Sequence, residues 1–407
     1  MSNALSTGTD YPLLADRFRP IFQRIAAGAR QREQDRSLPF EQIGWLKQAG
    51  FGAVRVPRQF GGAGASLPQL IYLLIELAEA DSNLTQALRG HFAFVEDRLN
   101  AHASSDQQRW FERFVAGELV GNAWTEVGSV KLGEVVTTVS QRDDRWVVNG
   151  SKYYSTGSIF ADWIDLFARR DDTGADVIAA VRTHQPGVQQ QDDWDGFGQR
   201  TTGSGSARFD NAEVEAEHLF EFSTRFRYQT AFYQLVLLAV LAGNGNAAVG
   251  DFAEQVRQRT RVFSHGNGDR VSADPQVQQV IGHASALAYA ATATALRAAD
   301  PAQRAYLARF ADDAEAERSA NIDAELESAQ GQVVVAELVL RLTSDLFNAL
   351  SASATRSGLQ LDRYWRNART AASHNPLIYK QRIIGDREIN GTEPPYIWQI
   401  GSGAQHA

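Results

Sequence analysis

The chain has 407 residues, enough for two or three domains, and its 43% apolar and 22% charged residues are an ordinary globular mixture. A formal net charge of -8, a pI near 5.6 and scattered basic residues argue against nucleic acid or an anionic membrane as a partner. The start lacks the pattern of a secretory signal, and the longest apolar run, residues 235–242, is too short to span a bilayer. The sequence therefore predicts a cytoplasmic protein.

Sulfur is almost absent from the chain. Met1 is the single methionine and there is no cysteine, whereas average usage gives roughly ten to fifteen such residues at this length. Both side chains pack readily in protein cores, so folding gives no reason to exclude them. Synthesis in bulk when sulfur is scarce would explain the absence and indicates a role in acquiring sulfur. Selection against oxidisable side chains and drift in the lineage are the alternatives.

The first block, residues 1–118, has the spacing of helices. Apolar residues recur every three or four positions over 67–78, and Ser66 directly before them is a suitable N-cap. Pro57 and the glycine-rich segment 61–66 break the helical pattern and predict a loop. We expect an N-terminal α-helical domain.

The second block, residues 119–223, alternates apolar and polar residues with period two, which predicts seven or eight short strands. The pair Asn149-Gly150 lies between two such runs and is typical of a hairpin turn. We expect a central β-domain over these residues.

Helical patterns return in the third block, residues 224–407. Four segments predict a four-helix bundle with short connections: 235–249, 277–299, 301–329 and 333–353. The glycine cluster at 243–250 lies inside this helical pattern and does not follow a strand, so it does not predict a nicotinamide dinucleotide site. The eight histidines show no HxH or HExxH spacing, and we expect no metal site.

Four collinear segments carry local motifs: residues 50–81, AWTEVGS at 123–129, NGSKYYSTGS at 149–158 and LDRYWRNART at 361–370. Together with the order of the three blocks, they resemble the acyl-CoA dehydrogenase superfamily. The resemblance implies an α+β fold with an N-terminal helical domain, a central β-barrel-like domain and a C-terminal four-helix bundle that ends in a flavin-site segment.

The base required for acyl-CoA dehydrogenation has no candidate in this chain. That reaction needs a carboxylate to remove a proton. The resemblance places the usual glutamate position at Gly358. The alternative position lies early in the first bundle helix, where no acidic residue occurs between Glu221 and Asp251. Dehydrogenation of an acyl-CoA is therefore not expected.

Three further stretches resemble the flavin-dependent monooxygenases of this superfamily, such as those acting on dibenzothiophene and methanesulfinate: 121–124, 192–209 and 366–395, where His374 ends an RTxxxH motif. The resemblance implies reduced FMN, favoured over FAD, which reacts with O2 to a flavin C4a-(hydro)peroxide. Since no nicotinamide site is found, a separate flavin reductase would supply the reduced flavin. The implied assembly is a homotetramer.

The resemblance also implies roles for individual residues. His374, with an imidazole near its ordinary pKa, would be the donor or proton shuttle at the departing oxygen. Asn122 would lie at the peroxide and Thr156 at flavin N5, while Ala371 replaces a second histidine of some relatives. The remaining flavin contacts would be Trp124, Thr125, Tyr154, Ser155, Phe263 and Asn375, with Arg261 and Arg356 reaching the phosphate from a neighbouring subunit. Buried packing and solvent exposure are the structural alternatives for these residues.

The substrate is predicted as a small organosulfur compound, with methanesulfinate, oxidised to methanesulfonate, as the best candidate. His91 and Arg369 are assigned to the substrate pocket, and an anionic substrate would need an arginine, either Arg89 or Arg369. The alternatives are an aromatic thiophene or an amine as substrate and, less favoured, an acyl-CoA dehydrogenase or a non-catalytic homologue.

Overall fold

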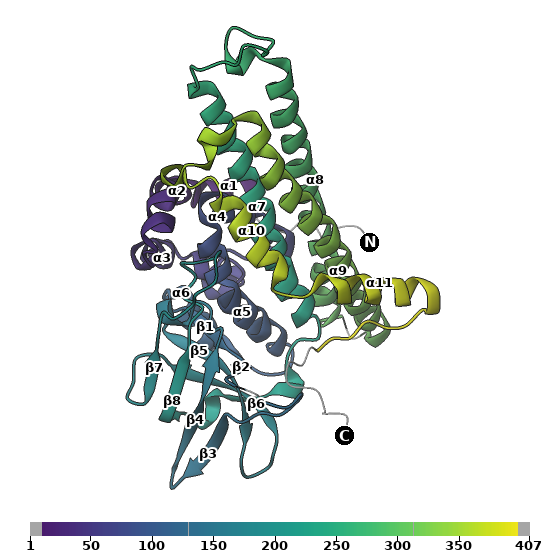
Figure 1. Ribbon diagram of the computed structural model, residues 1–407. Helices are drawn as coiled ribbons and strands as arrows, with labels where there is room; N and C mark the ends of the chain where they lie inside the picture. The colour runs from purple at the N-terminus through teal and green to yellow at the C-terminus, as the bar shows by residue number, and fades with distance from the viewer. Residues whose placement is uncertain (1–9, 129, 312, 398–407) are drawn as a thin grey trace, which may run out of the picture.

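The computed structural model describes residues 10–128, 130–311 and 313–397, so Met1 and Ser129, the last residue of the 123–129 motif, lie outside the described residues. Figure 1 shows the β-domain at one end of the molecule and the long helices at the other, with α4 and α5 reaching toward the sheet. The N-terminal helices are α1 (Tyr11–Asp16), α2 (Arg19–Asp35), α3 (Phe40–Gln48), α4 (Leu67–Ala87), α5 (Arg89–Ala101) and α6 (Gln108–Val115).

Helix α4 begins as predicted. The Ser66 hydroxyl accepts a hydrogen bond from the Gln69 amide, and the Gln69 side chain accepts one from the Ser66 amide, which completes a capping box. The sequence pattern did not predict the kink at Asp81, whose extended backbone interrupts the helix. Asp81 pairs there with buried Arg32 at 2.8 Å. The kink frees the Ser82 and Asn83 side chains to hold the loop after β7.

The middle of the chain forms a nine-stranded sheet within the described residues, against seven or eight strands predicted. Its main path runs β7-β8-β4-β3-β5-β6-β9, with β1 parallel to β5 and β2 antiparallel to β4. The strands are β1 (Val120–Ala123), β2 (Thr125–Glu126), β3 (Thr138–Arg142), β4 (Arg145–Tyr153), β5 (Trp163–Arg170), β6 (Asp176–Arg182), β7 (Val188–Gln190), β8 (Ala207–Val214) and β9 (Leu219–Glu221). The extra strands are short pieces that period-two alternation does not resolve.

The predicted hairpin at Asn149-Gly150 is wrong. Strand β4 runs through both residues, and the two-residue turn is instead Asp143 and Asp144, between the paired Arg142 and Arg145. Gly150 has φ +152°, and a Cβ there would lie 2.5 Å from the Thr137 hydroxyl oxygen. Gly150 therefore lies not in a turn but where the register of β4 against β8 shifts and where Thr137 approaches the backbone closely.

The helices of the C-terminal part also differ from the prediction. They are α7 (Gln229–Gln258), α8 (Pro275–Ala308), α9 (Ala314–Asp345), α10 (Arg363–Ser373) and α11 (Leu377–Asn390). Helix α8 continues through Pro301, and α9 continues through residues 330–332, so both predicted boundaries are wrong. Gly331 in α9 provides a close approach to α7, since a Cβ there would lie 2.8 Å from Leu238.

Helix α7 is the central helix of this arrangement. By length and composition it passes as a possible membrane span, but 72% of its most apolar window is buried inside the structure. It packs against α4, α8, α9 and α10 (Figure 1). This burial is that of a core helix, and the glycine cluster 243–250 lies within it. Helix α5 contacts both α7 and strand β1, and so connects the helical core to the sheet.

Candidate active site

The predicted site residues of the β-domain lie against the junction of α4 and α5. Asn122 is on β1, and a Cβ on Gly90 would lie 2.8 Å from its Oδ1, so the first turn of α5 touches it. The Ser158 hydroxyl donates to the backbone oxygen of Asn122 at 3.0 Å. A Cβ on Gly157 would likewise collide with the Ala87 carbonyl at the end of α4. These contacts bring Asn122 and Thr156 to the same corner.

Arg89 and His374 meet at this corner although 285 residues separate them. Arg89 is the first residue of α5, and His374 is the C-cap of α10. Arg89 Nη2 donates to His374 Nε2 at 3.0 Å. Because a guanidinium cannot accept a hydrogen bond, Nε2 must be unprotonated and the ring proton resides on Nδ1. His374 is thus a neutral imidazole that holds Arg89.

The environment of His374 keeps its ring neutral. Shielding from water and, next, the charge of Arg89 lower the pKa of His374 to about 3. Our expectation of an ordinary imidazole pKa is therefore wrong. His374 nevertheless retains an exposed surface, so the ring can still be reached from outside. At neutral pH it offers a proton only from Nδ1.

Asn375 ties this histidine to the helical core. Its Nδ2 donates to Gln234 on α7 at 2.9 Å, and its backbone oxygen accepts from Gln332 on α9 at 2.7 Å. Its Oδ1 lies 3.4 Å from His374 Nδ1. The predicted contact of Asn375 with the flavin remains a prediction, whereas its hydrogen bonds in the structure attach it to α7 and α9.

A chain of hydroxyl groups orients Thr156. The Thr202 hydroxyl donates to the Gln199 carbonyl at 2.9 Å, and Ser204 Oγ lies 2.7 Å from Thr202 Oγ1 and 2.8 Å from Thr156 Oγ1. Since each hydroxyl has one proton, Thr202 must accept from Ser204, and Ser204 must accept from Thr156. The lone pairs of Thr156 then remain as acceptors for a further group.

The loop that carries this chain is held by α4 and α10. Gln199 Nε2 donates to the Ser82 hydroxyl at 3.1 Å, and the Thr201 amide donates to Asn83 Oδ1 at 3.3 Å. The Gln199 amide donates to Asn367 Oδ1 at 2.6 Å. The sequence motifs did not predict Ser204 as a partner of Thr156. The hydroxyl-rich segment 201–206 was the feature that could have indicated it.

The other predicted flavin contacts of the β-domain lie nearby. Thr125 pairs with Tyr153 between β2 and β4, and Tyr154 is exposed with a left-handed φ of +58°. Ser155 is buried, and its hydroxyl has no hydrogen-bond partner among the described residues. Trp124 packs against Tyr233, with ring centroids 5.9 Å apart.

Arg261, Phe263 and Arg356 lie far from this corner within one chain. The loop after α7 carries Arg261 and Phe263, at the tip of the bundle in Figure 1. Helix α7 has 30 residues, which corresponds to about 45 Å at 1.5 Å per residue, and Gln234, the anchor of Asn375, is near its opposite end. All three residues are exposed. A single chain therefore does not bring them to the predicted flavin.

The two residues assigned to a substrate pocket have other contacts. His91 Nε2 donates to the Gly52 carbonyl at 2.9 Å, and its Nδ1 accepts from the Val120 amide at 3.2 Å, so both ring nitrogens are used by the backbone. Arg369 is exposed on α10 and donates to the Ser373 hydroxyl at 3.2 Å. These contacts give neither residue support as a pocket residue.

The two base positions of the dehydrogenation reaction stay without a carboxylate. Gly358 is exposed, and a Cβ added there would have nothing within 4 Å. Asp251, the first acidic residue of α7, pairs with Arg363 at 2.8 Å near the far end of the helix. In the part of the chain that the structure describes, no hydrogen bond or ion pair links a carboxylate to Arg89, His374, Asn122 or Thr156.

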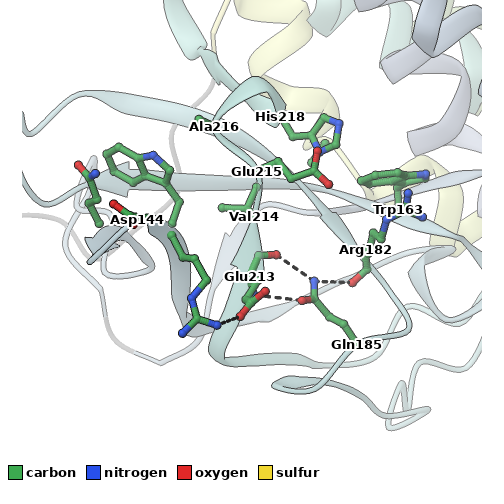
Figure 2. Close-up of a pocket in the computed structure, with 13 residues that line it drawn as sticks. Asp144, Trp163, Arg182, Gln185, Glu213, Val214, Glu215, Ala216 and His218 are labelled. Atoms are coloured by element: carbon green, nitrogen blue, oxygen red, sulfur yellow. Dashed lines mark hydrogen bonds and ion pairs between the residues drawn. The ribbon is translucent and has the colours of Figure 1, made fainter.

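A concave region lined by other residues lies on the sheet (Figure 2). Its volume is about 600 Å³, and Trp163, Arg182, Gln185 and His218 line it. His218 lies close to Glu215 and Glu217 in a grouping that resembles a metal-ligand set. However, Arg113 lies 3.0 Å from His218 Nε2, and Arg109 pairs with Glu217. The grouping is already neutralised by arginines.

The fold and these motifs define the class of protein. Three models of the acyl-CoA dehydrogenase family match the chain: the N-terminal domain over residues 12–118, the middle domain over 122–212 and the C-terminal domain over 235–377. Together they span most of its length, so the chain belongs to the acyl-CoA dehydrogenase family. The predicted family and fold are confirmed.

Within the family, the relatives that match over most of this chain include flavin-dependent monooxygenases. Dibenzothiophene monooxygenase from Rhodococcus qingshengii is 28% identical over 366 residues, 86% of each chain. The probable FMNH2-dependent monooxygenase SfnC from Pseudomonas putida is 26% identical over 92% of this chain and 94% of its own. FMN-bound TdsC from Paenibacillus sp. A11-2 superposes with a TM-score of 0.84 at 26% identity, covering 94% of this chain and 98% of that one. The predicted enzyme class, flavin-dependent monooxygenase, is confirmed, and the FMN-bound neighbour agrees with the predicted cofactor.

Proposed function

We propose that the chain is an FMNH2-dependent monooxygenase of a small organosulfur compound, with methanesulfinate as the best candidate substrate. The supporting observation is the corner formed by Asn122, Thr156, Arg89 and neutral His374, which has polar groups and a cation and, within the described residues, no carboxylate bonded to any of them. The reaction joins CH3SO2⁻, O2 and FMNH2 to give CH3SO3⁻, H2O and FMN. The near absence of sulfur from the chain fits an enzyme that works in the cytoplasm during sulfur limitation.

The residues of this corner fit a reduced flavin. Asn122 Oδ1 and the Ser155 hydroxyl are buried without a hydrogen-bond partner among the described residues. Thr156 is left as an acceptor by the Ser204 chain, which suits the N–H that reduced flavin carries at N5. Trp124, Thr125 and Tyr154 would lie along the ring. When bound, reduced FMN supplies the electrons that activate O2.

The side chains then have separate tasks. His374 holds a proton at Nδ1 and would donate a hydrogen bond from it to an oxygen on which negative charge develops. Asn122 positions the reacting oxygen with its side-chain amide. The aromatic rings of Trp124 and Tyr233 exclude water, which would otherwise divert the oxidant to hydrogen peroxide.

The proposed homotetramer is based on predicted flavin-site residues that lie far from the Asn122–His374 corner within one chain. Arg261, Phe263 and Arg356 would complete the phosphate end of a neighbouring chain's flavin site, in a homotetramer. A separate NAD(P)H:flavin reductase would deliver the reduced FMN.

The test is turnover with FMN, NADH and a flavin reductase under ¹⁸O2, with products followed by mass spectrometry. Label in methanesulfonate formed from methanesulfinate is the expected result. Dibenzothiophene is the second candidate, because a dibenzothiophene monooxygenase is among the relatives. Label in its sulfoxide or sulfone alone would change the substrate and keep the enzyme class. Peroxide without labelled product from either compound would contradict the proposal and direct the search to amines.

A further inference from the structure

Arg89 is the exception among the buried arginines of the described chain. Six arginines are buried, and five of them form an ion pair with a carboxylate: Arg32, Arg55, Arg98, Arg225 and Arg363. Arg89 is 6% exposed and forms none in the described part of the molecule. Its Nε is fully buried without a hydrogen-bond partner. A buried charge without a counter-charge is costly, so the fold holds this cation for something it does not itself supply.

The neighbours of Arg89 hold the guanidinium without neutralising it. Its Nη2 donates to the neutral ring of His374 at 3.0 Å, and its Cζ lies 4.9 Å from the centre of the Tyr233 ring. His374 in turn is exposed. The cation therefore lies beneath a surface that a small ligand can reach, next to the side chain proposed to donate a hydrogen bond.

We propose that Arg89 is the substrate-binding cation of this site and that the substrate is a small organic anion with a tetrahedral or pyramidal sulfur, a sulfinate. The inference rests on the proposed function and assigns its substrate class. A sulfinate accepts charge-assisted hydrogen bonds from the guanidinium N–H groups. A neutral thiophene offers no counter-charge and would leave Arg89 buried and unpaired.

Arg369, the other arginine considered for this task, does not meet the same conditions. It lies in the last turns of α10, it is exposed, and its Nε donates to Ser373 within its own helix. Water solvates an exposed guanidinium fully, so it discriminates weakly between anionic and neutral ligands. Position alone placed both arginines near His374, and burial distinguishes them.

Two isosteric probes test the charge without any turnover. Methanesulfonate and dimethyl sulfone share a tetrahedral sulfur and nearly the same size, but only methanesulfonate is charged. Binding of each to the full-length protein is measured by titration calorimetry at low ionic strength, in the wild type, R89M, R89K and R369M. R382M removes an equivalent charge from the exposed face of α11 and serves as the matched control.

The expected result is that R89M binds methanesulfonate roughly 10- to 100-fold more weakly, as for loss of a charge-assisted hydrogen bond, while dimethyl sulfone is unaffected. R89K should recover part of the affinity, and R382M should bind within about twofold of the wild type. Unchanged methanesulfonate binding in R89M, or a loss in R369M alone, would overturn the inference. So would an R89M variant that loses FMN affinity but keeps methanesulfonate affinity, since Arg89 would then serve the cofactor.

The two proposals fail separately in this design. If the wild type forms no labelled sulfonate but its methanesulfonate binding depends on Arg89, the proposed reaction fails and the anion site stands. If labelled sulfonate forms at the wild-type rate in R89M with unchanged KM, the reaction stands and the role of Arg89 is refuted. Circular dichroism shows whether R89M is folded, and R89K repeats the test with the cation's position shifted instead of removed.

Discussion

Helix α5 carries two kinds of buried charge, and the difference between them separates stability from function. Over its middle turns, Glu96 receives three hydrogen bonds from Arg55 and Asp97 pairs with Arg98, so every charge has a partner. At its first residue, Arg89 has no carboxylate partner among the described residues. Pairs of the first kind hold α5 against the preceding loop and α7, whereas the lone cation serves a ligand. Substitutions on each side can test this division.

The largest effect on stability is expected from breaking the buried Glu96–Arg55 ion pair. The Glu96 carboxylate is fully buried and accepts hydrogen bonds from Arg55 and the Tyr228 hydroxyl. Glu96→Gln leaves the Arg55 charge uncompensated, which should lower the free energy of unfolding by about 3–5 kcal/mol. Arg89→Met, in contrast, removes a charge that has no counter-charge and should leave stability unchanged or higher. Denaturant unfolding measures both.

Glu388→Gln, an exposed acid on α11, is the control for the change of charge. If Arg89→Met destabilised the protein as much as Glu96→Gln, the division between the two kinds of charge would fail.

Acid should destabilise the protein through His91, a fully paired residue of the same helix. Burial lowers the pKa of His91 to about 4. The folded state then binds fewer protons than the unfolded state between pH 6.5 and about 4, so stability is highest above pH 6.5 and falls as pH decreases through that window. The shift corresponds to about 3 kcal/mol. Unfolding at a series of pH values measures it.

Replacement of His91 by Gln, which keeps a donor and removes the titration, should flatten this part of the pH dependence even if overall stability is lower. An unchanged slope between pH 6.5 and 4 would show that other groups dominate, with His374 and His218, whose pKa values are lowered to about 3 and about 4, as the next candidates.

His374→Ala tests the proposed role of the histidine that contacts Arg89, the buried arginine without a carboxylate partner among the described residues. Loss of this hydrogen-bond donor should reduce coupled oxygenation by about 100-fold, equivalent to about 2.7 kcal/mol in the barrier. Oxygen uptake should continue with hydrogen peroxide as the product. The measurement compares labelled sulfonate with peroxide at equal oxygen consumption.

His283→Ala, an exposed histidine on α8, controls for the loss of an imidazole. Equal coupling in His374→Ala and the wild type would remove His374 from the reaction.

The sequence predicted helix and strand boundaries correctly where a local motif has one structural use. Ser66 as N-cap marked the start of α4 correctly because capping is a local device, and the structure adds Gln69 as the second member of a capping box. Glycine and proline have more than one use, and here the local interpretation failed. Gly150 and Gly331 serve close approaches inside a strand and a helix, and Pro301 lies within α8, where packing outweighs the lost hydrogen bond.

The site shows the same limit at longer range. His374 and Asn122 were identified through motifs, but no sequence pattern shows that Arg89 reaches His374 across 285 residues. The exceptional character of Arg89 appears only when the partners of all buried arginines are known. The hydroxyl chain through Ser204 likewise depends on the kink at Asp81, where a side-chain pair overrides helix propensity.

The smallest effect is expected at Ser204, because this residue acts on the reaction only by orienting the Thr156 hydroxyl. Ser204→Ala removes the acceptor for the Thr156 hydroxyl, whose remaining option is the Tyr154 carbonyl at 3.4 Å. Thr156 would then lose its fixed polarity, and turnover should fall by roughly tenfold, the effect of about one hydrogen bond. Because the side chain binds no substrate, KM for the sulfinate should not change, whereas kcat falls and FMNH2 binds more weakly. Ser204→Thr should restore the chain and most of the rate. A fall in thermal stability without a change in kcat would show that Ser204, like Glu96, only stabilises the fold.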